Sequence, residues 1–136
     1  VGHGETYIFA ADETLDDAKL WWSHGGVLHG DSPARIAFLS RIMSEIPKGK
    51  GLQQDTSYWD AVAATTDKET KDYMLFYFTY LRPFYRDICL DETSEYEVDV
   101  IDTWNMTIEN KGIFKGKFRV VLGGKPYMAI RMKKVK

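Results

Sequence analysis

The alternation of apolar and polar side chains between Tyr96 and Glu109 constrains the fold more than any other feature of this sequence. One parity is largely apolar and the other largely polar, which is typical of a β-strand that buries one face. Asp102 interrupts the apolar parity and Ile101 the polar one, so we expect a bulge or bend near Asp102. The apolar parity comprises Tyr96, Val98, Val100, Trp104, Met106 and Ile108.

This parity predicts that Trp104 is a core residue, and Trp104→Ala is then expected to cost about 3–5 kcal/mol. The neighbouring stretch Tyr73–Leu81 is almost entirely apolar and aromatic, which predicts a strand shielded on both faces. Pro83 follows it and requires an edge, a bend or a bulge. Cys89, in a strand-like context, is interpreted as a small core residue.

Other strand-like stretches alternate with turn residues through the same part of the chain. Four or five short antiparallel strands at this spacing predict a small β-sandwich. The further strands are expected at Tyr58–Thr66, Phe114–Leu122 and Tyr127–Val135, and the turns at Asp67–Asp72, Asn110–Gly112 and Gly123–Pro126.

A helix is predicted over Ser32–Ile46, before the strands. Ser32 suits the N-cap, Pro33 suits the first helical position, and Pro47 ends the helix. We expect its wide apolar arc either to fold back on the β-strands or to pair with a second copy in a homodimer. The arc comprises Ile36, Phe38, Leu39, Ile42, Met43 and Ile46, and the polar segment Lys48–Gln54 that follows predicts a domain boundary.

Length and charge limit the classes of function. A chain of 136 residues can bury one core. The formal net charge of −2 offers no basic field for nucleic acid or for an acidic membrane surface, and no apolar stretch reaches the roughly 18 residues of a membrane span. Because the chain starts at Val1 without a Met, directly in a site-like stretch, we expect a fragment of a longer protein.

The candidate site lies in Val1–Gly30, which holds all three histidines, a double glycine and the Trp21–Trp22 pair. Imidazoles and a carboxylate supply hydrogen bonds, indoles supply flat apolar faces, and glycines let the backbone approach a ligand. This mixture is typical of a sugar-binding cleft. The predicted substrate-binding residues are His3, Glu5, Trp22, His24 and His29.

Several interpretations of these residues stay open. Glu5 can bind a hydroxyl, play a structural part or act as a catalytic carboxylate, although glycoside hydrolysis needs two carboxylates and no partner is evident. The tryptophans can both be packing residues, or one can form a stacking platform. Zinc bound by His3, His24 and His29 is conceivable, but no spacing supports it, so neither a metal nor a cofactor is predicted. No P-loop, dinucleotide fingerprint or serine-nucleophile motif occurs.

Five segments, GHGETY, WWSHGG-x-LHGDSPARIAFL, YLRPFYR, IDTWNMTI and GKPYMAIRM, resemble the C-terminal part of bacterial glycoside hydrolases related to pectin side-chain apiosidases. The resemblance implies a catalytic TIM barrel followed by a small β domain. Residues 1–50 would then be the end of the barrel: its last strand end, a site loop and its last helix. Residues 53–136 would be a β-sandwich accessory domain. The acid/base and the nucleophile would lie on earlier strands, outside this chain.

The predicted fold class is therefore α+β: a small antiparallel β-sandwich preceded by a helix and a loop-rich remnant of the last βα unit of a TIM barrel. The predicted function is that of a C-terminal piece of a glycoside hydrolase, inactive alone. It would form part of the rim of the sugar cleft and contact the rest of the barrel and, through the parent enzyme, an oligo- or polysaccharide. The alternatives are an independent carbohydrate-binding module and a purely structural interaction domain. The sequence leaves open a cytoplasmic or a secreted location.

Overall fold

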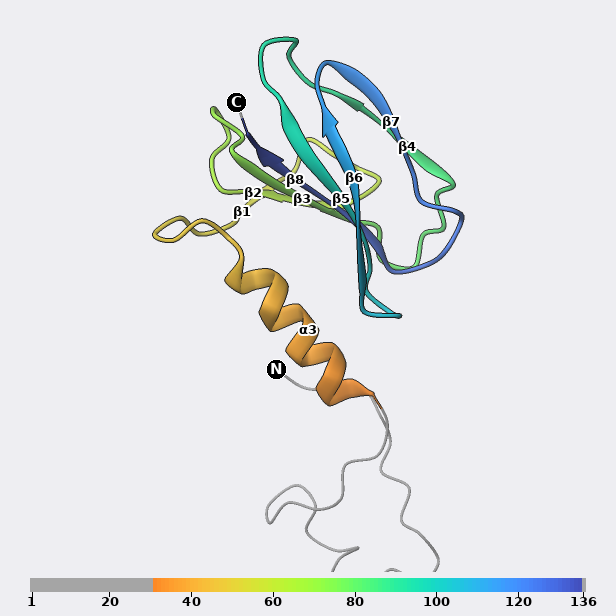
Figure 1. Cartoon of the computed structure of the whole chain (residues 1–136). Coiled ribbons are helices and arrows are strands. Elements are labelled where there is room, and N and C mark those ends of the chain that lie inside the picture. Colours follow the sequence, from red (N-terminus) through yellow and green to blue (C-terminus); the bar gives the residue numbers. More distant parts are fainter. Residues whose placement is uncertain (1–30, 136) are drawn as a thin grey trace, which may run out of the picture. The chain divides into compact units, whose positions relative to one another are not determined.

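The computed structural model describes residues 31–135, which form one helix and eight strands (Figure 1). The chain divides into two units, Val1–Ala37 and Phe38–Lys136, and every described strand belongs to the second. The predicted domain boundary near residue 50 stays a prediction. The elements are α3 (Ser32–Ser44), β1 (Gln53–Asp55), β2 (Val62–Thr65), β3 (Tyr73–Tyr77), β4 (Tyr85–Cys89), β5 (Tyr96–Asp102), β6 (Thr107–Phe114), β7 (Lys117–Val121) and β8 (Met128–Lys134).

The strands form two antiparallel sheets that face each other. The larger sheet has the order β1-β2-β3-β8-β5-β6, and the smaller one pairs β4 with β7. Side chains of both sheets share one hydrophobic core, in which Ile88 of β4 and Val120 of β7 pack with residues of the larger sheet. The predicted small β-sandwich with one helix is therefore confirmed. The loop-rich remnant predicted before the helix lies outside the described residues.

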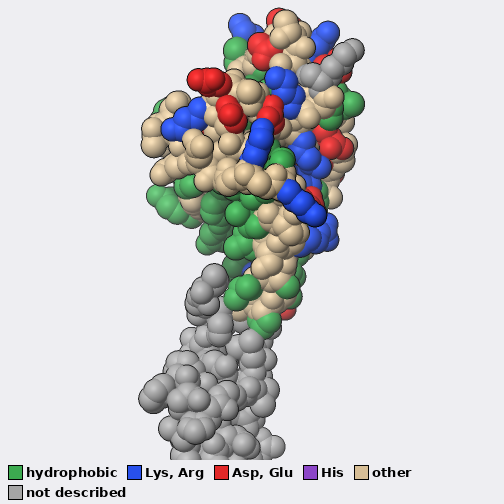
Figure 2. All heavy atoms as spheres, turned by 90° about the vertical axis from the view of Figure 1, so that its left-hand side faces the viewer, with side chains coloured by type: hydrophobic (Ala, Val, Ile, Leu, Met, Phe, Trp, Pro, Cys, Tyr) green, Lys and Arg blue, Asp and Glu red, His purple; other side chains and the backbone are tan. Residues whose placement is uncertain are grey.

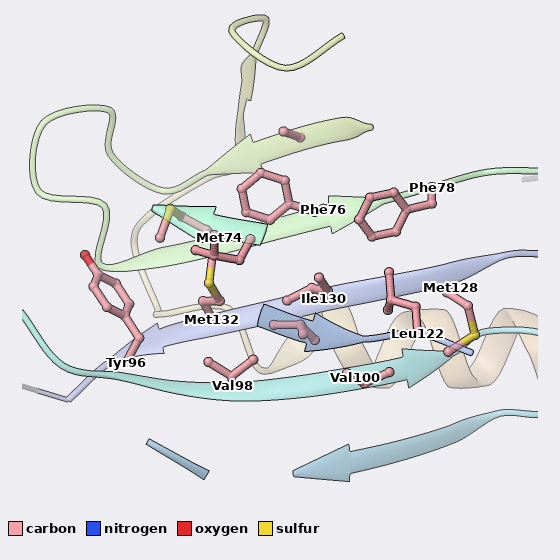
Figure 3. Close-up of a cluster of buried hydrophobic side chains, with 13 residues drawn as sticks. Met74, Phe76, Phe78, Tyr96, Val98, Val100, Leu122, Met128, Ile130 and Met132 are labelled. Carbon is pink, nitrogen blue, oxygen red and sulfur yellow. The ribbon is translucent and has the colours of Figure 1, made fainter. Parts of the chain in front are cut away.

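Along each strand successive side chains point to opposite faces, and this alternation determines which of them face the core. Met128, Ile130 and Met132 of β8 point into the core as the sequence predicts (Figure 3). The central strand β3 contributes Met74 and Phe76 to the same cluster. Its intervening residues point to the opposite face of the sheet, where Tyr77 packs in a second cluster. The prediction of a strand shielded on both faces is confirmed for Tyr73–Tyr77.

That second cluster involves the helix. Ile42 is buried with Ile101 and Ala129 of the sheet, and Phe38 packs against them. The helix thus folds back on its own sheet, while Leu39 and Met43 stay exposed. The homodimer stays a prediction.

The helix begins and ends slightly differently from the prediction. The amide of Arg35 donates to the Asp31 carbonyl at 2.9 Å, and the helix begins at Ser32, so the N-cap is Asp31 rather than Ser32. It ends at Ser44, two residues before the expected Ile46. No helix within residues 31–135 is long and apolar enough to cross a membrane.

Buried charges join the end of the helix to the sheet. Arg131 Nε of β8 donates to Asp99 Oδ2 of β5 at 2.9 Å, and the same guanidinium pairs with Glu45 just beyond α3. Asn110 Nδ2 donates to Asp99 Oδ1 at 2.8 Å. Burial alone raises the pKa of Asp99, but the hydrogen bonds from Arg131 and Asn110 outweigh it and hold the pKa below its usual value.

Three local predictions are wrong. Trp104 lies in the turn between β5 and β6, 52% exposed, because the chain reverses at residues 103–106 instead of continuing as a strand. The segment Asn110–Gly112 belongs to β6 rather than to a turn. Of the bulge or bend expected near Asp102, the bend is present as the turn at residues 103–106, and the sheet irregularity lies between Val98 and Asp99. Cys89 is exposed, because its neighbour Ile88 occupies the core-facing parity of β4.

Candidate interaction surface

The five residues predicted from the sequence to bind substrate all lie outside the described residues. They are His3, Glu5, Trp22, His24 and His29. The sugar cleft therefore stays a prediction, and so does each of the three roles considered for Glu5. Across residues 31–135, no group of three or more His, Cys, Asp and Glu side chains is placed to hold a metal ion.

The antiparallel topology brings four loops to one end of the sandwich. Since β3 runs towards Tyr77 and β2 starts at its partner Val62, the β1–β2 and β3–β4 loops meet at the same end. The β5–β6 turn and the β7–β8 loop join them there, as the pairings of β8 with β3 and β5 require. In Figure 1 the β5–β6 and β7–β8 connections lie at the lower edge of the β domain, and the β4–β5 and β6–β7 connections at its upper edge. The four loops comprise residues 56–61, 78–84, 103–106 and 122–127.

Large apolar side chains gather on this end. Trp59 is 96% exposed, Tyr80 75% and Phe84 72%, and half-exposed Trp104 lies in the same set of loops. Leu81 also belongs to these loops, and three exposed strand ends border them, namely Val62, Tyr85 and Val121. We call this surface the aromatic end, defined by Trp59, Val62, Tyr80, Leu81, Phe84, Tyr85, Trp104 and Val121.

The opposite end is charged. Its loops carry Asp67, Lys68, Glu69, Lys71, Asp72, Asp91, Glu92, Glu95 and Lys115. Figure 2 shows one face, on which Lys, Arg, Asp and Glu side chains crowd the upper part of the β domain and hydrophobic side chains lie below them. A contiguous set of exposed apolar side chains marks an interaction site, so the contrast between the two ends points to the aromatic end as the contact surface.

Backbone hydrogen bonds tie the loops of the aromatic end together. The Tyr127 amide donates to the Thr79 carbonyl at 2.6 Å, and the Leu122 amide to the Phe84 carbonyl at 2.8 Å. Gly124 adopts a φ of 70°, and the Phe84 ring lies within 3.0 Å of where its Cβ would stand, so only glycine fits this turn unstrained. The surface is therefore preformed rather than assembled from independent loops.

Three residues other than glycine at this end have a left-handed backbone conformation. Thr79 has a φ of 54°, Met106 of 58° and Tyr127 of 61°. Such conformations cost roughly 1–3 kcal/mol each for residues other than glycine and concentrate at functional surfaces. Lys71 is the fourth such residue within the described part of the chain, and it lies at the charged end.

Trp104 borders an open hollow of about 270 Å³. Its indole stacks on the Tyr127 ring, with centroids 5.5 Å apart and planes at 26°. The other lining residues are Asp102, Asn105, Lys125 and Pro126. A flat aromatic pair beside polar groups is the kind of surface that can take a sugar ring or an apolar protein side chain.

The polar groups of this hollow already bind one another. The Asp102 carboxylate accepts the Asn105 backbone amide at 2.9 Å and the Asn105 side-chain amide at 2.8 Å, and Lys125 Nζ lies 3.6 Å away. Burial alone raises the pKa of Asp102, but the Asn105 hydrogen bonds and the Lys125 charge outweigh it, so the net pKa is lowered. Asp102 is therefore a charged structural acceptor and holds the turn that presents Trp104.

A second hollow, of about 350 Å³, opens on the β4–β7 sheet. It is lined by Asp87, Ile88, Cys89, Lys117 and Phe118. Asp87 is engaged in two hydrogen bonds from Arg119, at 2.7 and 2.9 Å. The Asp87 carboxylate is therefore already bound, and Phe118 is the one aromatic residue of the lining. For both reasons this hollow is a weaker candidate for a binding site than the aromatic end.

The aromatic end is not predicted from the sequence, although several of its residues lie in segments named in the sequence analysis. The segments YLRPFYR, IDTWNMTI and GKPYMAIRM carry part of the family resemblance, and the structure brings parts of all three to this one end. The available signal was the presence of aromatic residues in turn-forming segments, such as Tyr80 and Phe84 around Pro83, where polar residues are the norm.

Comparison with known proteins supports both the fold and a family. A solved structure described as "a putative glycoside hydrolase from Bacteroides vulgatus ATCC 8482" matches with a TM-score of 0.67 and 24% sequence identity, over 84% of this chain and 26% of that one. A second, described as "Glycoside hydrolase", matches with a TM-score of 0.50 and 14% identity, over 74% of this chain and 25% of that one. At these identities the likeness shows a shared fold, and the chain spans about a quarter of the length of these structures.

No curated protein sequence matches the chain. A family model, however, matches residues 59–133, which is more than half of the chain and covers most of the β-sandwich. The chain belongs to the family described as "Domain of unknown function (DUF5605)".

Proposed function

We propose that this chain is the C-terminal part of a glycoside hydrolase, the parent enzyme, and that its β-sandwich is a non-catalytic accessory domain. The observation that carries the proposal is the match of most of this chain to about a quarter of two longer proteins whose descriptions name a glycoside hydrolase. The resemblance of the sequence motifs to apiosidase-related enzymes with a TIM barrel supports the same reading. On this proposal residues 1–50 close the catalytic barrel.

The chemistry of the described carboxylates supports a non-catalytic role. Glycoside hydrolysis needs a carboxylic acid with a raised pKa beside a second carboxylate. At the aromatic end Asp102 has a lowered pKa, and Asp60 is paired with Arg86. Asp102 is therefore not the acid that this reaction needs, and Asp60 is held in an ion pair, so the proposal assigns both catalytic carboxylates to the parent enzyme upstream.

The proposal gives the N-terminal residues a part in substrate binding. His3, Glu5, Trp22, His24 and His29 would lie at the rim of the sugar cleft, where the strands of a TIM barrel end. Imidazoles and the Glu5 carboxylate would hydrogen-bond hydroxyl groups, and Trp22 would stack on a sugar ring.

A hydrolysis assay tests this function. The parent enzyme and the 136-residue chain are compared on a panel of aryl glycosides and pectic oligosaccharides, and we expect turnover by the parent enzyme and none by the chain. Turnover by the chain that disappears in Glu5→Gln would make Glu5 catalytic and refute the accessory role. A parent protein without turnover on any glycoside would refute the assignment to glycoside hydrolases.

A second candidate function is sugar binding by the sandwich itself. The stacked Trp104–Tyr127 pair beside the hollow is the observation that favours it. Engagement of the nearby polar groups with one another argues against it, because sugar recognition needs free donors and acceptors.

A further inference from the structure

We propose that the aromatic end is the surface on which the catalytic part of the parent enzyme packs. The inference rests on the proposed function and adds to it by naming the docking surface and the chemistry of its partner.

Apolar exposure in the β domain is concentrated rather than scattered. Twelve large hydrophobic side chains within the described residues are exposed, and eight of them define the aromatic end. The other four, Leu39, Met43, Ile113 and Val135, lie on the helix, on β6 and near the C-terminus. Single exposed hydrophobics are normal on a soluble protein, whereas a gathered set marks an interaction site.

The path of the chain favours the parent enzyme as the occupant. Within residues 38–136, Glu45 pairs with Arg131 in the middle of the sheet. Ile42 packs with Ile101 and Ala129, which are paired two residue pairs nearer to the aromatic end. From Glu45 back to Phe38 the helical residues of this unit therefore run towards the aromatic end, where Phe38 packs near Tyr77 and Ile108. The unit thus begins on the side that carries the exposed aromatics, and on the proposed function the catalytic part precedes it in the sequence.

Charge defines the partner further. Arg82 and Lys125 are the exposed charged side chains of the four loops, because Asp60 is largely buried in its pair with Arg86 and Asp102 is buried. The complementary surface should therefore have an apolar centre that covers Tyr80 and Phe84, with carboxylates at its rim. An apolar centre with a polar rim is the usual composition of an interface between proteins or domains.

Hydroxyl-radical labelling tests the inference, since it oxidises exposed aromatic side chains. The 136-residue chain and the parent enzyme are labelled in parallel and the modified residues are quantified by mass spectrometry. We expect Trp59, Tyr80 and Phe84 to be labelled in the chain and to lose most of that labelling in the parent enzyme. Ile113, exposed on β6, is the internal control and should be labelled equally in both.

Each other occupant gives a different result, and each would overturn the inference. Equal labelling of the aromatic end in both proteins would show that the parent enzyme leaves it open. Protection in the chain that grows with protein concentration would assign the surface to a second copy. Protection that requires an added pectic oligosaccharide would assign it to a sugar.

Variants give an independent readout. Tyr80→Ser combined with Phe84→Ser should lower the melting temperature of the parent enzyme more than that of the 136-residue chain, whereas Ile113→Thr should change both equally. An equal shift of the double variant in both proteins would mean that these side chains support only the sandwich, and the inference would fail. If the parent enzyme protects the aromatic end but hydrolyses no glycoside, the docking inference stands and the proposed function fails.

Discussion

Replacement of Arg131 by Met should remove the charge that holds the helix to the sheet while keeping a side chain of similar length. Arg131 and Asp99 are each only 4% exposed, and Arg131 Nη2 lies 2.8 Å from Asp99 Oδ2. Breaking a buried pair by removing one partner typically costs about 3–5 kcal/mol, because the other charge stays buried. We expect the lower half of that range, since Lys133 Nζ lies 3.5 Å from Asp99 and Asn110 still donates to it.

Arg119→Met is the matched control for this prediction. Arg119 also pairs with an aspartate, donating from Nε and Nη2 to the two carboxylate oxygens of Asp87, but both side chains are more than half exposed. Exposed pairs contribute about 0–1 kcal/mol, so the control should lose far less stability. Urea unfolding of both variants, followed by far-ultraviolet circular dichroism at pH 7, gives the two free-energy changes. Equal losses would show that burial of the Arg131 pair has no energetic consequence and would refute the reasoning.

Acid should weaken the same network. The folded-state pKa of Asp99 is depressed, so its contribution to stability is present above the unfolded value of about 3.9 and is lost as the pH falls through the folded pKa. Arg131→Met removes the main depressing partner, so the acid unfolding midpoint should move to higher pH. An unchanged midpoint would contradict the assignment of the shift to Arg131.

Three further predictions follow from the described residues. Trp104→Ala should cost about 1 kcal/mol in chemical unfolding, the value of an aromatic pair, instead of the 3–5 kcal/mol expected for a core tryptophan. Asp91 has its pKa lowered to about 2 by hydrogen bonds from Thr93 and Ser94, so stability should decline between about pH 4 and pH 2, and Asp91→Asn should flatten that decline in a pH series of thermal melts. Cys89 should react fully with a thiol reagent in the folded chain, and a slow reaction that needs denaturant would place it in the core after all.

The sandwich was predictable because the signals for its strands are local. Met128, Ile130 and Met132 alternate in sequence and all face the core, and Tyr96 and Val98 do the same on β5. Such alternation fixes which face is buried without any knowledge of the partner strand. Ile42 and Phe38 likewise showed the face of the helix that packs on the sheet, although not that Leu39 and Met43 would stay exposed.

The β5–β6 turn was missed because it contains neither Gly nor Pro. Its shape comes from the Asp102 carboxylate, which accepts the Asn105 amide, and from the left-handed conformation of Met106. Because neither Gly nor Pro interrupts the sequence, the apolar–polar alternation continues through the turn, and it wrongly predicts that Trp104 lies in the core. In the opposite direction, Asn110 and Gly112 do not reverse the chain: they flank the register shift of β6, where Gly112 has a φ of 101° and pairing with β5 continues on both sides.

The aromatic end could not be predicted because it depends on topology. Tyr80, Phe84 and Trp104 lie on loops that are distant in sequence, and only the strand order shows that they share one end of the sandwich. His3 and Glu5, which are predicted to bind sugar, fall outside the described residues, so their role stays a prediction.

Titration calorimetry of the 136-residue chain with an oligosaccharide that the parent enzyme hydrolyses tests most directly whether the sandwich is an accessory domain. The account predicts that any saturable binding is the same in the chain and in Trp104→Ala, and is lost in Trp22→Ala, because sugar contacts belong to the rim of the cleft. Saturable binding that disappears in Trp104→Ala would contradict the account and make the sandwich a carbohydrate-binding module.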